Sequence, residues 1–85
     1  MPEDVQTILI IDDHPLMRRG IVQLVAMESA LRLVGEAGNG QQGLALARQL
    51  RPDLILLDLN MRGLNGLETL RALKATDMDS RVLIL

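Results

Sequence analysis

Three aspartates follow directly on apolar segments of the chain. The run Thr7–Ile11 stops at Asp12 and Asp13, and the run Leu54–Leu57 stops at Asp58. If these runs are neighbouring strands, the three carboxylates converge and repel one another unless a proton or a cation lies between them. A hard divalent ion such as Mg²⁺ prefers oxygen ligands of this kind and keeps waters that a phosphoryl oxygen can replace. The pattern therefore predicts a magnesium site at Asp12, Asp13 and Asp58.

Asp58 is also a candidate nucleophile toward a phosphoryl group. An aspartate carboxylate can form an acyl phosphate while a metal ion neutralises the charge of the transferring group. The segment Asn60–Gly66 has the composition of a loop, and a backbone carbonyl in it could complete the ligands of the metal. Gly63 and Gly66 would let the backbone of this loop approach the site closely.

Each of these residues also has a plainer interpretation. A single aspartate after an apolar strand is more often a solvated strand end or a helix cap, and only the joint pattern of two such strands favours the functional interpretation. His14 precedes Pro15, so it is more simply a residue of the first helical turn than a ligand or a proton shuttle. Arg18 and Arg19 are expected on a solvated helix face.

The elements that must position these residues alternate between strand and helix patterns. Apolar runs without alternation, such as Leu54–Leu57, are typical of strands at the centre of a parallel sheet. Short links between strands and helices imply right-handed crossovers, and hence an open, doubly wound α/β sheet that binds ligands at the carboxyl ends of its strands. The strands are expected at Thr7–Ile11, Leu31–Ala37 (an edge strand), Leu54–Leu57 and Arg81–Leu85, and the helices after Pro15, from an Asn39 cap to about Leu50, and through Leu67, Leu70 and Leu73.

Composition excludes several classes of function. The 85 residues include no cysteine and no aromatic residue, and nine Lys and Arg stand against eleven Asp and Glu. Thiolate chemistry and disulfides are therefore excluded, and a reducing compartment, the cytoplasm, is expected. Without a basic field or rings for stacking, binding of nucleic acid by this segment is disfavoured. The apolar runs are much shorter than the ~20 residues of a membrane span, so no membrane association is expected.

Two blocks of the sequence resemble a known family. Ile8–Gly20, which contains the Asp-Asp-His-Pro segment, and Pro52–Met61, which contains Leu-Asp-Leu-Asn-Met, are similar to the receiver domain of two-component response regulators. The resemblance is to the NarL/FixJ class, and within it to the nitrate/nitrite regulators. It runs from about Thr7 to Leu85 and implies a flavodoxin-like (CheY-like) doubly wound parallel sheet.

The resemblance also implies roles for the acidic residues. Asp58 would be the phosphoacceptor, with a sensor histidine kinase as the donor. Asp13 and Asp58 would bind Mg²⁺ directly, Asp12 would bind it through water, and the carbonyl of Asn60 would complete the protein ligands. A receiver of this kind is a signalling domain rather than an enzyme. In the family, a carboxy-terminal helix-turn-helix domain binds DNA and regulates transcription.

A phosphohydrolase of the haloacid dehalogenase type is the main alternative, since that class also places an aspartate nucleophile after an apolar parallel strand. The motif of that class is Asp-x-Asp, however, and Asn60 stands here at the position of the second aspartate. An interaction module without phosphotransfer is a third possibility. Turnover of a small phosphate ester would distinguish the phosphohydrolase from a receiver. Titration with magnesium would distinguish the interaction module from a receiver.

The sequence is further expected to be a partial receiver domain, cut after its fourth strand. The family's next helix, fifth strand and last helix, its switch Ser/Thr and Lys, and the DNA-binding domain would all lie beyond Leu85. The segment Val82–Leu85 would then be an uncovered edge. We therefore expect this chain to self-associate as a dimer, through the edge strand or by exchange of elements.

Overall fold

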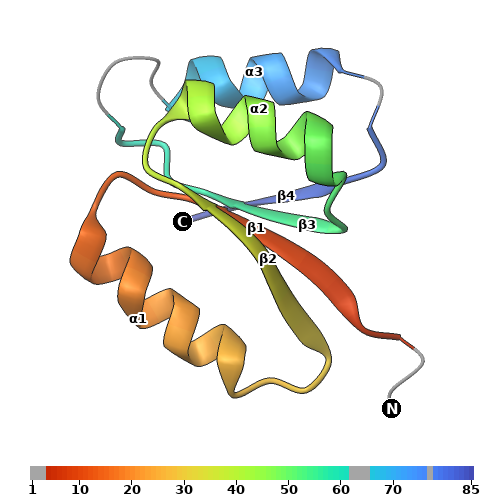
Figure 1. Ribbon diagram of the computed structural model, residues 1–85. Coiled ribbons are helices and arrows are strands. Elements are labelled where there is room, and N and C mark those ends of the chain that lie inside the picture. Colours follow the sequence, from red (N-terminus) through yellow and green to blue (C-terminus); the bar gives the residue numbers. More distant parts are fainter. Residues whose placement is uncertain (1–3, 62–65, 77) are drawn as a thin grey trace.

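Uninterrupted apolar runs form the central strands of a parallel sheet. The computed structural model describes residues 4–61, 66–76 and 78–85. The strand order is β2-β1-β3-β4, and all neighbouring pairs are parallel (Figure 1). The two strands that end in acid, β1 and β3, are central, and β2 lies at an edge, as the sequence predicts. The bounds are β1 (Gln6–Ile11), β2 (Leu31–Ala37), β3 (Leu54–Leu57) and β4 (Arg81–Ile84).

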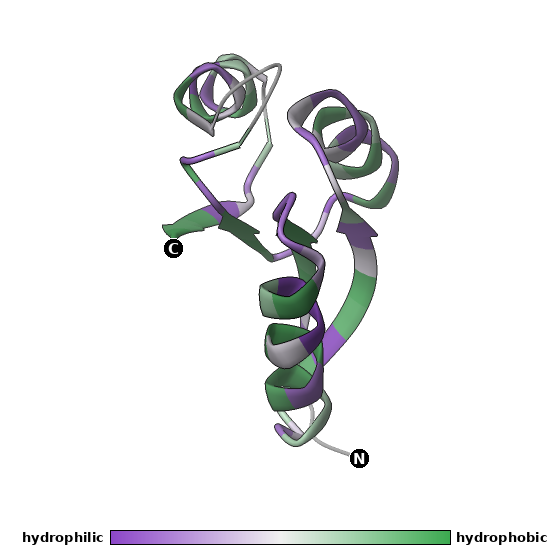
Figure 2. Ribbon diagram, turned by 90° about the vertical axis from the view of Figure 1, so that its left-hand side faces the viewer, coloured by the Kyte–Doolittle hydropathy of each residue, from purple (hydrophilic) through white to green (hydrophobic). Residues whose placement is uncertain are grey.

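Helices cover both faces of the sheet. α1 (Pro15–Ala26) lies on one face, and α2 (Gly40–Leu50) and α3 (Gly66–Ala75) lie side by side on the other (Figure 1). Each helix carries hydrophilic and hydrophobic residues in alternation along its turns (Figure 2). This arrangement is the predicted doubly wound fold. No helix among the described residues combines the length and the apolar character needed to cross a membrane.

Local signals in the sequence explain where two of the helices begin. Pro15 occupies the first turn of α1, where its missing N–H leaves no hydrogen bond unmade. The side chain of Asn39 caps α2 by accepting from the backbone N–H of Gln42 at 2.8 Å. The Gln42 side chain reaches back, but it accepts from the N–H of Gly38 at 3.0 Å rather than from that of Asn39. The reciprocal bond of a capping box, from the Asn39 N–H to the Gln42 side chain, is therefore displaced by one residue.

Alternate residues of β1 supply the core on the two sides of the sheet. Ile8 and Ile10 face α1 and pack with its Val25, whereas Leu9 and Ile11 belong to the larger core beneath α2 and α3. These last four side chains of β1 are nearly or fully buried. The carboxyl end of β1 is therefore held rigidly from both faces, which fixes the position of the residues that follow it.

Candidate functional site

Backbone hydrogen bonds carry the strand ladders past the ends of β1 and β3. The N–H of Asp12 donates to the carbonyl of Ala37 at 3.0 Å, and the N–H of Asp58 donates to the carbonyl of Ile11 at 3.0 Å. Asp12 and Asp58 thus lie next to each other at the carboxyl edge of the sheet. This is the edge at which open parallel sheets bind ligands.

The three predicted aspartates do converge at this edge. One side-chain ligand atom from each of Asp12, Asp13, His14 and Asp58 lies within 4.8 Å of all the others. Asp12 is fully buried and Asp58 is 6% exposed, whereas Asp13 is partly exposed. The pocket beside them is lined by Asp13 and His14 together with Gly38, so the cluster can be reached from solvent.

His14 takes part in this cluster, which the sequence interpretation of it as a simple first-turn residue missed. It does cap the start of α1, but its side chain makes no capping hydrogen bond. Instead its Nδ1 lies 3.0 Å from Asp12 Oδ1 and 3.0 Å from Asp58 Oδ2. The hydrogen bond with Asp12, aided by the charge of Asp13 and by a second hydrogen bond with Asp58, raises the pKa of His14 above its ordinary value. Adjacency to an acid pair was the only signal in the sequence.

The backbone after Asp58 fixes the orientation of its carboxylate. The N–H of Asn60 donates to Asp58 Oδ1 at 2.9 Å, so Oδ2 is the oxygen that faces His14. The predicted close approach at Gly66 is confirmed, because a Cβ there would overlap the Cα of Leu59 and stand 2.5 Å from the Asp58 carbonyl oxygen. Gly63, the other glycine singled out, lies outside the described residues.

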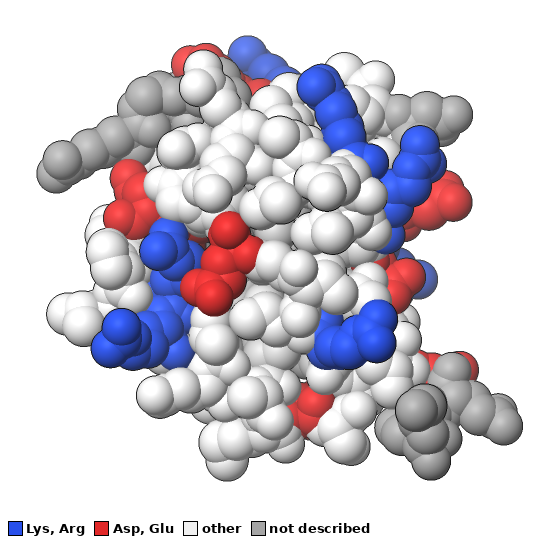
Figure 3. All heavy atoms as spheres, in the orientation of Figure 1, with Lys and Arg blue, Asp and Glu red and all other residues white. Residues whose placement is uncertain are grey.

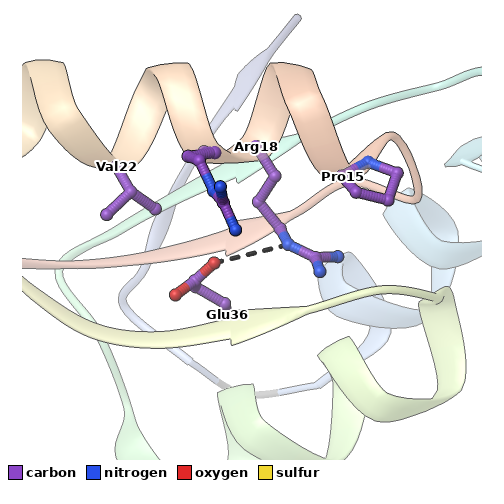
Figure 4. Close-up of a pocket in the computed structure, with 5 residues that line it drawn as sticks. Pro15, Arg18, Val22 and Glu36 are labelled. Carbon is purple, nitrogen blue, oxygen red and sulfur yellow. Dashed lines mark ion pairs between the residues drawn. The ribbon is translucent and has the colours of Figure 1, made fainter.

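Arg18 connects α1 to the backbone of the acidic edge. Its guanidinium donates to the carbonyl of Asp12 at 2.7 Å, and its Nε lies 3.3 Å from Glu36 Oε1 on β2. Figure 4 shows the side chain reaching from α1 toward Glu36, beside Pro15 and Val22. In Figure 3, charges of both signs meet on the side of the molecule where α1 begins. The expected solvated face therefore applies to the exposed Arg19 but not to Arg18.

The donor set fits a hard divalent cation. Oδ2 of Asp12 is buried and has no hydrogen-bond partner among the residues that the structure describes. An ionised oxygen removed from water without a partner is costly, and a bound cation would offset that cost. Three carboxylates supply the oxygen ligands that Mg²⁺ prefers. Asn60, whose carbonyl was the fourth predicted ligand, lies next to the cluster through its N–H to Asp58.

Comparison with known proteins identifies relatives along nearly the whole chain. Residues 8–85 match the family model of the response regulator receiver domain. The nitrate/nitrite response regulator protein NarL of Escherichia coli is 55% identical over 78 residues, which are 92% of this chain and 36% of that protein. NarP of Escherichia coli is 47% identical over the same shares of both chains. The chain thus spans a little over a third of the length of these relatives.

Solved structures of receiver domains have the same fold as this chain. The signal receiver domain of a Mycobacterium tuberculosis protein named as the response regulator NarL superimposes with a TM-score of 0.89 at 33% identity. The match covers 95% of this chain and 65% of that one. The response regulator domain of Thermotoga maritima CheB gives a TM-score of 0.88 at 30% identity, over 94% of this chain and 59% of that domain's chain.

Proposed function

The chain belongs to the response regulator receiver domain family, of the NarL type, and we propose that Asp58 is the residue on which it accepts a phosphoryl group. Phosphoacceptance is general to this family of signalling domains. The single observation that carries the assignment to Asp58 is its place at the end of β3, within the acidic cluster and with its carboxylate oriented by the Asn60 N–H. Asp12 is fully buried and its Oδ1 also accepts from the backbone N–H of His14, whereas Asp58 is 6% exposed, which makes Asp12 the poorer nucleophile.

Mg²⁺ is the proposed cofactor, held by Asp12, Asp13 and Asp58 with the carbonyl of Asn60. Oδ2 of Asp12, which is buried and has no hydrogen-bond partner within the described ranges, supports a cation at this position. When bound, the ion would supply positive charge against the negative charge of the transferring phosphoryl group. As the family resemblance implies, Asp13 and Asp58 would bind the ion directly and Asp12 would bind it through a water.

The chain's own residues orient the acceptor for transfer. An oxygen of Asp58 forms a bond to phosphorus as the bond between phosphorus and the nitrogen of a donor phosphohistidine breaks, and the product is an acyl phosphate on Asp58. The Asn60 N–H limits rotation of the carboxylate, and Gly66 allows the backbone of α3 to pack directly on the Asp58–Leu59 peptide. Positioning of this kind is the main contribution a protein makes to phosphoryl transfer.

The donor we propose is a sensor histidine kinase, and the setting is a cytoplasmic two-component system that regulates transcription. The names of the relatives, nitrate/nitrite response regulators, support a role in signal response. The formal charge of -2 and the absence of aromatic residues argue against DNA binding by these residues themselves. DNA binding is therefore assigned to a helix-turn-helix domain of the parent protein, with residues 1–85 as part of its receiver domain.

Phosphorylation by a small donor tests the assignment. The protein that carries this sequence is incubated with acetyl phosphate and Mg²⁺, and the modified residue is located by mass spectrometry after trapping of the acyl phosphate. We expect one phosphoryl group on Asp58 and none in the Asp58→Asn variant. Asp79→Asn is the matched control, because Asp79 is an exposed aspartate outside the acidic cluster. This variant should still be phosphorylated on Asp58. Phosphate on Asp12 or Asp13 would contradict the proposal.

The same preparation tests the phosphohydrolase alternative. An enzyme of that type turns over a small phosphate ester many times, whereas a receiver releases phosphate only from its own aspartate. Asn60, which cannot act as the acid or base that such an enzyme needs, favours the receiver. We expect no sustained release of phosphate from an ester in excess over the protein.

A further inference from the structure

The imidazole of His14 has a position that phosphoacceptance by Asp58 does not explain. Its Nδ1 lies 3.0 Å from Asp12 Oδ1, 3.2 Å from Asp13 Oδ1 and 3.0 Å from Asp58 Oδ2. One nitrogen atom therefore faces all three carboxylates of the proposed metal site. Because the oxygens come from two strand ends and the loop between β1 and α1, this convergence is a property of the fold rather than of one turn.

Neither packing nor helix capping accounts for the position of this ring. The side chain is 56% exposed, so it does not fill the core. His14 is the N-cap of α1, yet its side chain accepts no hydrogen bond from the first turn. The polar contacts that the structure gives the ring are to the three carboxylates.

An independent feature of the cluster points to a bound cation. Asp12 is fully buried, and its Oδ2 has no hydrogen-bond partner in the described part of the chain although its Oδ1 contacts His14. The imidazole thus satisfies one oxygen of this carboxylate and leaves the other available. A metal ion bound among these groups would partner the remaining oxygen.

We propose that His14 Nδ1, after releasing its proton to solvent, is a further protein ligand of this site beside the three aspartates and the Asn60 carbonyl. This makes it a mixed nitrogen and oxygen site able to take a divalent first-row transition ion such as Zn²⁺ as well as Mg²⁺. The inference rests on the proposed metal site of Asp12, Asp13 and Asp58 and adds a ligand to it. The four ligand atoms, all within 4.8 Å of one another, form a set that can surround one ion.

The chemistry of the two ions gives the proposal a distinctive consequence. Imidazole nitrogen is a good ligand for Zn²⁺, which commonly binds His together with Asp or Glu. Mg²⁺ instead prefers oxygen ligands and keeps several waters, so it gains little from an imidazole. His14 should therefore strengthen the binding of Zn²⁺ while leaving that of Mg²⁺ nearly unchanged.

Calorimetric titration of two variants with each ion separately tests this. His14 is the only histidine of the chain, so the protein must be prepared without a histidine tag. His14→Phe keeps a ring of similar size and removes both nitrogens, and Asp58→Asn removes a carboxylate. We expect His14→Phe to raise the Zn²⁺ dissociation constant by ~10-fold or more, since even loss of an outer-shell partner commonly costs a metal site this much.

The two ions and two variants separate the possible failures. If Asp58→Asn weakens neither ion, the proposed metal site itself is wrong. If Asp58→Asn weakens both ions but His14→Phe leaves Zn²⁺ binding unchanged, the metal site stands and the role of His14 is wrong. If His14→Phe strengthens the binding of both ions, the imidazole competes with the metal rather than binding it, which also overturns the inference.

A spectroscopic measurement keeps the test independent of folding of the Phe variant. In the unmodified protein, Zn²⁺ should shift the NMR signal of His14 Nδ1 more than that of Nε2, because Nδ1 is the nitrogen that faces the carboxylates. His14→Gln, a second variant at the same exposed position, should weaken Zn²⁺ binding in the same direction. Perturbation of Nε2 alone would contradict the geometry.

Discussion

The backbone N–H of Asp58 donates a hydrogen bond to the carbonyl of Ile11, the last residue of β1. This bond extends the pairing of β1 with β3, in which Ile11 lies opposite Leu57. It brings the acid that follows one strand beside the acid that follows the other. The carboxylate cluster is thus set by strand register, and a slip of either strand would separate its members.

Replacement of Gly66 by alanine is expected to destabilise the protein by about 1–3 kcal/mol, the usual cost of forcing an added methyl group into a packed site. The new Cβ would overlap the Cα of Leu59 and come within 2.5 Å of the Asp58 carbonyl oxygen, both of which are backbone atoms that cannot turn aside. The midpoint of urea unfolding measures the effect.

Gly20→Ala is the matched control for that substitution. Gly20 lies within α1, and a Cβ there would meet nothing within 4 Å. Alanine is favoured over glycine in a helix interior by about 1 kcal/mol, so this variant should be more stable than the unsubstituted protein. Equal effects of the two substitutions would show that Gly66 is not constrained as the structure indicates.

Arg18→Ala is expected to destabilise the protein by about 1–2 kcal/mol, most of it from loss of a charge-assisted hydrogen bond. Arg18 donates to the Asp12 carbonyl at 2.7 Å, and its side chain is only 25% exposed. The pair with Glu36, which is half-exposed, adds little because solvent screens it. Arg19→Ala, an adjacent exposed residue, should change stability by less than about 0.5 kcal/mol. If denaturant unfolding shows equal losses of stability for Arg18→Ala and Arg19→Ala, Arg18 does not connect α1 to the acidic edge as the structure indicates.

The strands and the acidic site were predictable because their signals are local. Leu54–Leu57 is a strand with the predicted bounds, since an apolar run ending at a carboxylate marks its end, although only alternate residues of the strand are buried. The start of α1 follows from Pro15. Convergence of the aspartates needed one further assumption, that the two apolar runs are neighbours in the sheet, and parallel topology makes that assumption natural.

The contacts of His14 and Arg18 were not predictable in the same way. His14 follows the acid pair directly and Arg18 lies one helical turn further on, but their partners include Asp58 and Glu36, which come from other parts of the sheet. The conformation of the turn between β1 and α1 and the direction of α1 bring these side chains to their partners. The sequence signals for α1 likewise do not show that several of its apolar residues remain exposed, namely Leu16, Met17 and Leu24.

The pKa of His14, the single histidine, should lie above its ordinary value of 6.5 when followed by NMR in the absence of metal. The largest cause is the hydrogen bond with Asp12, so Asp12→Asn should lower the pKa most, whereas Asp79→Asn should leave it unchanged. Since the folded-state pKa exceeds the unfolded one, the stability that this contact contributes is present below pH 6.5 and is lost as pH rises through the folded value. A His14 pKa at or below the ordinary value would contradict the contact.

The isolated 85-residue chain is expected to self-associate through β4. β4 is an edge strand whose Leu83 is 50% and Ile84 is 47% exposed, and Leu85 beyond it is 47% exposed. An exposed apolar edge strand is a template for a second copy, and pairing there buries surface that a small aromatic-free core leaves open. Leu83→Lys should weaken the association, because edge lysines oppose pairing. Leu67→Lys changes an equally exposed leucine, 49%, on α3 and should not. Sedimentation equilibrium at low micromolar concentration measures the association of both variants and of the unsubstituted chain. If the unsubstituted chain is a 9.4 kDa monomer that unfolds cooperatively, self-association through β4 is ruled out.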